Sequence, residues 1–255
     1  MTGERIDLNA DLGEAFGAYP MGADEAVLVY VTSANVACGF HAGDPAVMRR
    51  TVRLAHAHGV AIGAHVSLPD LQGFGRRELR ISADEAYELT LYQLGALHGF
   101  ARAEGAAVAH VKPHGALYNM AARDPALAAG IAAAVHDFDP RLVLYGLAGS
   151  ALPAAGAACG LAVAHEAFCD RSYEADGSLS PRSMPGAVLD DPAAAAAQLL
   201  ALVRDGALTA RDGSRVAIRC DSVCLHGDRP DAASYARHLR AALAAAGVAV
   251  APPRA

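Results

Sequence analysis

One complete unit of strand, helix and strand lies in TSANVACGFHAGDPAVMRRTVRLAHAHGVAIGAH (residues 32–65). Its two short apolar runs, residues 32–36 and 60–64, are typical of parallel strands that are covered on both faces. Between them, an Asp-Pro pair (residues 44–45) supplies an N-cap and a first-turn proline for a helix over residues 46–58, which a glycine ends. This order of elements predicts an α/β fold with a parallel sheet.

The same alternation continues along the whole chain. A Ser-x-x-Glu capping box opens a long helix over residues 82–105, Asp-Pro pairs begin two more helices, and a last helix is expected over residues 231–246. A (β/α) barrel needs roughly 250 residues, so the 255 residues of the chain fit one barrel domain, residues 1–255, with seven or eight strands. The expected strands are residues 5–9, 32–36, 60–64, 107–111, 142–146, 161–165, 222–225 and 248–250.

The composition excludes several classes of protein. Hydrophobic residues make up 53% and charged residues 19% of the chain, which excludes a disordered protein. The net charge of −6 argues against binding to nucleic acids or anionic membranes, because both need basic surface.

The five cysteines are odd in number and irregularly spaced, which predicts reduced thiols. The charged N-terminal segment has no apolar core, so we expect no signal peptide and a cytoplasmic protein. The uncharged residues 142–164 are expected to form a strand, a helix and a strand, not a membrane span.

Polar and ionisable residues follow the predicted strands. Because the carboxyl ends of parallel strands meet at one mouth of a closed barrel, we expect these residues to line a shared pocket. They are Asn9, Asp11 and Glu14 after the first strand, Asn35 and His41 after the second, His65 after the third, Lys112, His114 and Tyr118 after the fourth, Glu166, Asp170 and Arg171 after the sixth, and His226 and Asp228 after the strand at residues 222–225.

Four of these residues, Asp11, His41, His65 and His226, are ligand types that could surround a divalent metal ion. Structural hydrogen bonding is the alternative for the histidines. The sequence contains no P-loop, no dinucleotide-binding fingerprint, no nucleophile elbow and no H-E-x-x-H motif.

Three segments carry further candidates. VKPHGALYN (residues 111–119) holds Lys112, which suits a carboxylate or phosphate ligand or, when desolvated, a nucleophile. SLPDLQGFGRRE (residues 67–78) contains Arg76. The long segment over residues 166–183 suggests a lid, a binding segment or a partner surface, with a plain surface insertion as the alternative.

Six segments together resemble the LamB/YcsF family, in the same order along the chain. They are IDLNADLGEAFG (residues 6–17), NVACGFHAGDP (35–45), GAHVSLPDLQGFGRR (63–77), VKPHGALYN (111–119), EAFCDRSYEADGSLSPR (166–182) and CLHGD (224–228). The resemblance implies an irregular (β/α) barrel of the glycoside hydrolase/deacetylase type. It also implies the ATP-dependent opening of 5-oxo-L-proline to L-glutamate, carried out with partner subunits B and C and with ATP and magnesium as cofactors.

That chemistry assigns tasks to the candidate residues. Lys112 and Arg171 would stabilise the phosphoryl group and the developing oxyanion, and Arg76 or Arg171 would hold the substrate carboxylate. The general base would be one of His41, His65, His114, Asp11 and Glu166. The alternative functions are a metal-dependent carbohydrate deacetylase or hydrolase and a non-catalytic, substrate-binding component. A homo-oligomer is compatible with the sequence.

Overall fold

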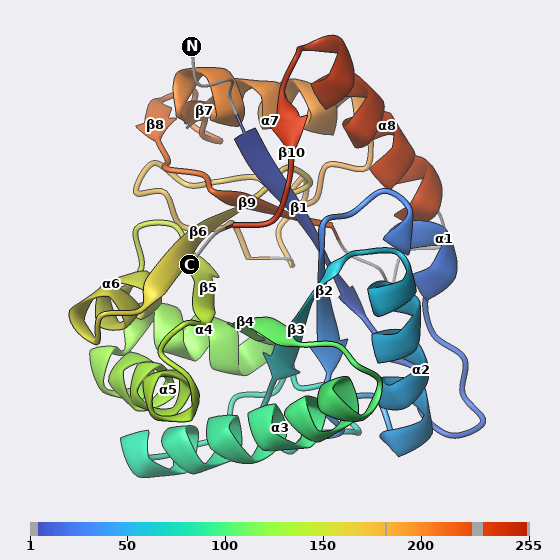
Figure 1. Ribbon diagram of the computed structural model, residues 1–255. Helices are drawn as coiled ribbons and strands as arrows, with labels where there is room; N and C mark the ends of the chain where they lie inside the picture. The colour runs from blue at the N-terminus through green and yellow to red at the C-terminus, as the bar shows by residue number, and fades with distance from the viewer. Residues whose placement is uncertain (1–4, 182, 226–231, 254–255) are drawn as a thin grey trace.

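The computed structural model describes residues 5–181, 183–225 and 232–253. Within this part of the chain, seven parallel strands form a barrel that closes between its last and first strands, with helices around it (Figure 1). The fold expected from the sequence is thereby confirmed. In order around the barrel, the strands are β1 (Arg5–Leu12), β2 (Ser33–Ala37), β3 (Ala61–Val66), β4 (Val108–Pro113), β5 (Val143–Leu147), β6 (Ala162–Phe168) and β9 (Ser222–Leu225).

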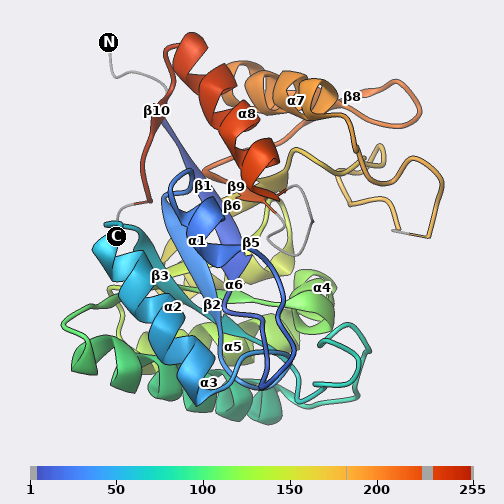
Figure 2. The ribbon, with the colours of Figure 1, turned by 90° about the vertical axis from the view of Figure 1, so that its right-hand side faces the viewer.

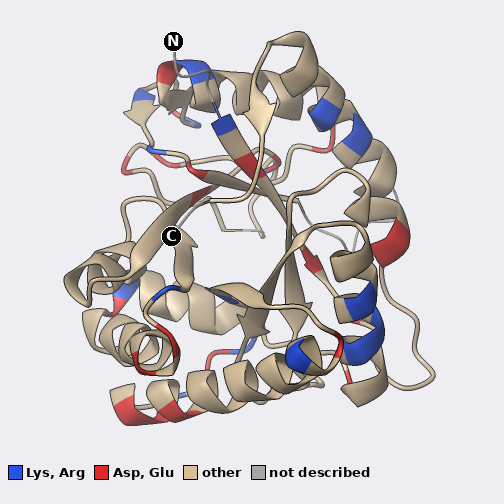
Figure 3. Cartoon of the chain, in the orientation of Figure 1, with Lys and Arg blue, Asp and Glu red and all other residues tan. Residues whose placement is uncertain are grey.

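Helices cover the outer face of the barrel. Asp44 caps the N-terminus of α2, and Ser82 and Glu85 form the predicted capping box at the start of α3. Figure 3 shows that Lys, Arg, Asp and Glu are concentrated on these outer elements in this view. The helices are α1 (Asp24–Leu28), α2 (Pro45–Ala57), α3 (Ala83–Ala103), α4 (Gly115–Arg123), α5 (Pro125–Phe138), α6 (Ala151–Ala158), α7 (Pro192–Asp205) and α8 (Ala232–Ala245).

Three differences from the expected elements stand out. The strand expected at residues 248–250 is β10 (Ala249–Val250), which pairs with the start of β1 outside the closed ring. A hairpin of β7 (Ala207–Thr209) and β8 (Arg215–Ala217) was not predicted. Helix α4 was not predicted either. Its N-cap is His114, which is not one of the residue types that usually cap helices and makes no capping hydrogen bond, so the sequence contains no signal for the start of this helix.

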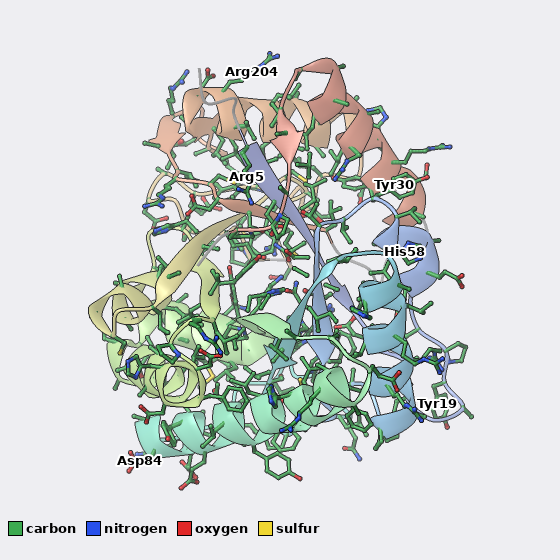
Figure 4. All side chains as sticks on the ribbon, viewed as in Figure 1. Arg5, Tyr19, Tyr30, His58, Asp84 and Arg204 are labelled. Carbon is green, nitrogen blue, oxygen red and sulfur yellow. The ribbon has the colours of Figure 1, made fainter. Side chains whose placement is uncertain are left out.

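The strands have two different faces, and this corrects the expectation of continuous apolar runs. In β1, Ile6, Leu8 and Ala10 belong to the main hydrophobic core, whereas the alternate residues Asp7 and Asn9 make polar contacts inside the barrel. Successive side chains of a strand point to opposite faces. The barrel therefore has an apolar outer layer under the helices and a polar interior, and side chains fill the space between the ribbons (Figure 4).

The loops at the carboxyl ends of the strands form the opposite side of the barrel from β10 (Figure 2). The sequence analysis placed several site residues on these loops. Instead, Asp11, His65, Lys112 and Glu166 belong to the strands themselves, which extend two or three residues farther than expected. Their side chains are consequently held by the barrel, which is more rigid than a loop.

The remaining expectations concern thiols and membrane spans. All five cysteines are free, and Cys38, Cys169 and Cys224 are buried, as predicted for reduced thiols. Residues 142–164 contain β5, α6 and the start of β6, also as predicted. Among the described residues, none of the helices is long and apolar enough to cross a membrane.

Candidate active site

Lys112 is the charged centre of the barrel interior. It is the only lysine among the 21 lysine and arginine residues of the chain, and its side chain is 4% exposed. Its Nζ lies 3.0 Å from Asp11 Oδ1 and 2.9 Å from Glu166 Oε1. Asn9 Oδ1 and Cys224 Sγ complete the cage at 3.1 and 3.0 Å. A compact ammonium suits this cage, whereas a guanidinium is larger, planar and fixed in its donor geometry.

The cage keeps Lys112 and Asp11 ionised. Burial works against the charge on Lys112, but the carboxylates of Asp11 and Glu166 outweigh it, so the Lys112 pKa lies well above its ordinary value. Burial likewise works against the charge on Asp11, but the ammonium of Lys112 holds the Asp11 pKa well below its ordinary value. A fixed positive charge therefore lies at the floor of the site at neutral pH.

A layer of amides lies beneath this charge. Asn9 Oδ1 accepts hydrogen bonds from Lys112 and from Asn35, while Asn9 Nδ2 donates to Glu166 Oε1 at 2.9 Å and to Ser222 Oγ at 2.7 Å. Since both ends of the amide are engaged, its orientation is fixed. Neither Asn9 nor Asn35 lines the cleft at the barrel mouth. The structure thus places them where they support Lys112, not where the sequence analysis expected them to bind substrate.

His110, which the sequence analysis did not single out, anchors the amide layer. Its Nε2 lies 2.8 Å from Asn35 Oδ1, and its ring stacks on Tyr145 with 4.4 Å between the centroids. Burial and the charge of Lys112 lower the His110 pKa to about 3, so the ring is neutral and donates to the asparagine. Gly63 makes room for this ring, because a Cβ at that position would lie 2.1 Å from it.

Asp7 lies in the barrel interior among four hydroxyl groups. This carboxylate accepts hydrogen bonds from the hydroxyl groups of Thr32, Ser33, Tyr145 and Ser222. Burial nevertheless raises the Asp7 pKa, against the effect of these hydrogen bonds. The alternation of Asp7, Asn9 and Asp11 along β1 is the signal that could have found this layer in the sequence.

Three histidines gather at the mouth of the barrel beside Glu14. The rings of His41 and His114 stack with 3.9 Å between their centroids, and His65 meets both edge-on. Burial lowers the His114 pKa to about 3 and the His41 pKa well below its ordinary value. One ligand atom from each of the four residues can be chosen so that all lie within 4.8 Å of one another, which makes the group a candidate metal site.

This group differs from the metal set expected from the sequence. His41 and His65 belong to both sets, whereas Glu14 and His114 replace Asp11 and His226. Asp11 instead pairs with Lys112. His226 and Asp228 lie outside the described residues.

The loop over residues 70–77 packs against the histidines. His114 Nε2 lies 2.9 Å from the backbone oxygen of Phe74, a non-glycine residue with φ of +54°. The next residue, Gly75, has φ of +64°, and a Cβ there would lie 2.8 Å from His41 Cβ. Glycine adopts the left-handed conformation readily, whereas for Phe74 it costs free energy that tertiary contacts must offset. The turn places the Phe74 carbonyl against His114.

A cleft of about 650 Å³ opens above Lys112 and the histidines. Residues 171–181 form one wall and contribute Ser178 and Ser180 to the lining. They lie within the segment over residues 166–183 that the sequence analysis singled out, the first three residues of which belong to β6. Arg171 lines the cleft and donates to the backbone oxygens of Ser180 and Ala187, so it also shapes this wall. The ionisable residues of the lining include Asp11, Glu14, His65, Arg76, Lys112 and Arg171.

Most of the predicted site residues lie in the lining of this cleft or are buried close behind it. Tyr118 lines the cleft and is 5% exposed, and burial together with Glu166 raises its pKa well above the ordinary value. Glu166 and His41 are fully buried directly behind the lining. Asp170 is buried after β6 but does not line the cleft.

The fold and the site together define a (β/α)-barrel protein with a polar, ionisable site at the carboxyl ends of its strands. The family model of the LamB/YcsF family matches residues 6–255. The chain therefore belongs to the LamB/YcsF family, as the six segments indicated.

Known relatives support this assignment. The chain is 61% identical over 246 residues to a protein of Methylococcus capsulatus that is named as the A component of 5-oxoprolinase, covering 96% of this chain and 95% of that one. The crystal structure of a "Lactam Utilization Protein" from Thermus thermophilus superposes with a TM-score of 0.93 at 49% identity, covering 98% of this chain and all of the other.

A more distant structure shares the fold. The catalytic domain of a peptidoglycan N-acetylglucosamine deacetylase from Eubacterium rectale matches with a TM-score of 0.52 at 11% identity, covering 98% of this chain and 89% of that one. At this identity the likeness concerns the barrel alone.

Proposed function

We propose that this chain is the A component of an ATP-dependent 5-oxoprolinase, which opens 5-oxo-L-proline to L-glutamate together with partner subunits B and C. The names of its full-length relatives support this reading. One observation carries it: the only lysine of the chain is buried between two carboxylates at the floor of an open polar cleft. The proposal includes a location in the cytoplasm, with ATP and magnesium as cofactors.

The reaction needs a fixed positive charge. The lactam of 5-oxoproline is an unstrained amide, so its opening must be coupled to ATP. Transfer of the γ-phosphoryl group to the lactam oxygen makes the ring carbon electrophilic. One water then adds to that carbon and the C–N bond breaks, and a second water releases phosphate. Negative charge develops on oxygen in each step, and preorganised cations stabilise such charge most effectively in a site that excludes water.

The residues of the cleft divide these tasks. Lys112, held by Asp11 and Glu166, faces the oxygen on which charge develops. Arg76, at the rim, binds the carboxylate of the substrate, because a guanidinium donates two parallel hydrogen bonds to such a group. Arg171 keeps the wall formed by residues 171–181 in place around the substrate.

His65 and His114 line the cleft near Asp11 and hold the attacking water. His65 is the member that contacts Asp11, with 3.3 Å between His65 Nε2 and Asp11 Oδ2. A histidine and carboxylate in contact can share the proton that leaves the water.

The test is glutamate release from 5-oxoproline by the chain with its two partner subunits and Mg·ATP. Omitting this chain should abolish the release. The variant Lys112→Arg keeps the charge but not the compact ammonium, and should lower the rate by at least about 100-fold. The exposed Arg80 gives a matched control, since Arg80→Met should leave the rate unchanged. A Lys112→Arg protein that folds and works at the wild-type rate would contradict the proposal.

Binding separates the proposed role from a purely structural one. The isolated chain should bind labelled 5-oxoproline, and the Lys112→Arg variant should bind it more weakly. A chain that binds neither 5-oxoproline nor nucleotide, alone or with its partners, is a scaffold, and the proposal fails.

A further inference from the structure

We propose that Glu14, His41, His65 and His114 hold one divalent transition-metal ion of the zinc class at the mouth of the barrel. Three imidazoles and one carboxylate are the donor set that such an ion prefers, whereas magnesium prefers oxygen ligands alone. The ion would thus be distinct from the magnesium that accompanies ATP. The inference does not depend on the proposed reaction.

The hydrogen bonds of two histidines fix which nitrogen carries a lone pair. His65 Nδ1 lies 3.0 Å from the backbone oxygen of Lys112, so it donates its proton there and leaves Nε2 as the free nitrogen. His114 Nε2 lies 2.9 Å from the backbone oxygen of Phe74, which leaves Nδ1 free in the same way. Backbone carbonyls that orient the far nitrogen of a ligating histidine are typical of metal sites.

The two free nitrogens face each other. His65 Nε2 and His114 Nδ1 are 3.0 Å apart, and with the ring protons on His65 Nδ1 and His114 Nε2 there is no proton between them. Two lone pairs at this distance repel unless a cation or a proton lies between them. Nitrogen ligands at about 2.1 Å from one ion lie about 3.0–3.4 Å from each other in octahedral or tetrahedral geometry. The observed separation matches this range.

The other two ligands complete the group. His41 Nε2 lies 3.5 Å from Glu14 Oε1, and His114 Nδ1 lies 3.8 Å from the same oxygen. His41 is fully buried, and neither of its ring nitrogens makes a hydrogen bond within the described residues. A buried imidazole without hydrogen bonds costs free energy. Coordination of an ion by one ring nitrogen would offset that cost.

The surrounding structure is built around these rings. Gly75 lets the loop over residues 70–77 approach His41 and His114 more closely than any side chain would permit. Asp11 Oδ2 lies 3.3 Å from His65 Nε2, at the border of the group. When bound, an ion of this class supplies Lewis acidity to a water molecule or a substrate oxygen.

Metal binding can be measured without partners, substrate or ATP. The chain is dialysed against a chelator, and Co²⁺ is then added while visible d–d absorption and calorimetry are recorded. We expect one equivalent to bind, zinc to displace it, millimolar magnesium to leave it in place, and the melting temperature to rise. His41→Gln and Glu14→Gln should each weaken binding by about 100-fold or more, since loss of even an outer partner of a metal ligand costs about 10–100-fold.

His56→Gln is the matched control, because His56 is exposed on α2 and its loss should leave Co²⁺ binding unchanged. The proposal is overturned if the wild-type chain binds neither Co²⁺ nor Zn²⁺ stoichiometrically, which would mean that a shared proton joins His65 and His114. It is also overturned if both ligand variants bind like the wild type. Circular dichroism tests whether each variant is folded. If one variant does not fold, Co²⁺ binding by the other variant decides the outcome. Failure of glutamate release leaves these outcomes untouched, so the two proposals can fail separately.

Discussion

Lys112 Nζ lies 2.9 Å from Glu166 Oε1 inside the barrel, where neither side chain is more than 4% exposed. Asp11 Oδ1 lies 3.0 Å from the same ammonium. One cation thus offsets two carboxylates that have little access to water. Charges buried in this way cost several kcal/mol in desolvation, which their mutual attraction repays only in good geometry. The cage is therefore better explained by a functional need for a fixed charge than by a gain in stability.

Removal of the cation should be costly. In Lys112→Met the carboxylates of Asp11 and Glu166 lose their common partner, and we expect the free energy of unfolding to fall by about 3–5 kcal/mol. Urea unfolding at neutral pH measures this change. The double variant Lys112→Met/Glu166→Gln removes one of the stranded charges and should recover part of the stability, but no glutamate release. Equal stability of the single variant and the wild type would show that the carboxylates find other partners.

The outer layer of the barrel could be predicted from the sequence because its signals are local. Caps such as Asp44 and Ser82 mark where helices begin, and the apolar runs mark where strands lie. The strands were predicted to end too early, because residues such as Lys112 and Glu166 are polar and polar residues are typical of loops. Only the closed barrel, with its polar interior, gives these side chains a place within strands. The alternation of Asp7, Asn9 and Asp11 along β1 is the local sign of that interior in the sequence. Which polar side chains meet there depends on the closure of seven strands, which no local pattern shows.

The site was predicted in outline for a similar reason. Residues after parallel strands converge by topology, so Asp11, His65 and Lys112 could be brought together without coordinates. Which histidines share one point depends on loop geometry. The ring of His114 is oriented by the Phe74 carbonyl, which a left-handed turn at Phe74 and Gly75 presents to it, and no pattern in the sequence predicts that contact.

Gly63 should tolerate no side chain. A Cβ there would lie 2.1–2.4 Å from atoms of the His110 ring, so Gly63→Ala must displace the ring from Asn35. Overpacking of this kind costs typically about 1–3 kcal/mol, and the displaced imidazole would add an unpaired polar group. Thermal unfolding measures the loss. Gly95 in α3 is the control, because a Cβ there meets no atom within 4 Å. Gly95→Ala should be neutral or stabilise by up to about 1 kcal/mol. If both variants lose stability alike, His110 is not held as described.

Asp7 should make stability depend on pH. Its pKa is raised in the folded protein, mainly by burial, so the folded state holds the proton more tightly than the unfolded state. Where the unfolded chain has lost this proton and the folded chain retains it, stability falls as pH rises. The contribution is fully present below the unfolded pKa and is lost as pH rises through the folded pKa. Asp7→Asn is permanently neutral and should flatten this part of the curve. Melting temperatures of both proteins across acidic and neutral pH test the point, and parallel curves would refute it.

Arg76 should control substrate affinity and not stability. It is exposed at the rim of the cleft, and its guanidinium lies 5.0 Å from the centroid of the Phe74 ring, which holds it over the opening. If it binds the substrate carboxylate, Arg76→Ala should raise the KM for 5-oxoproline by about 10-fold or more, since a charge-assisted hydrogen bond is worth about 1.5–3 kcal/mol. The melting temperature should change little, because surface substitutions usually stay within about 0.5 kcal/mol. Steady-state kinetics of the reconstituted system, with Arg80→Ala as the control outside the cleft, give both parameters. A fall in kcat at unchanged KM would place Arg76 in the chemical step instead of in substrate binding.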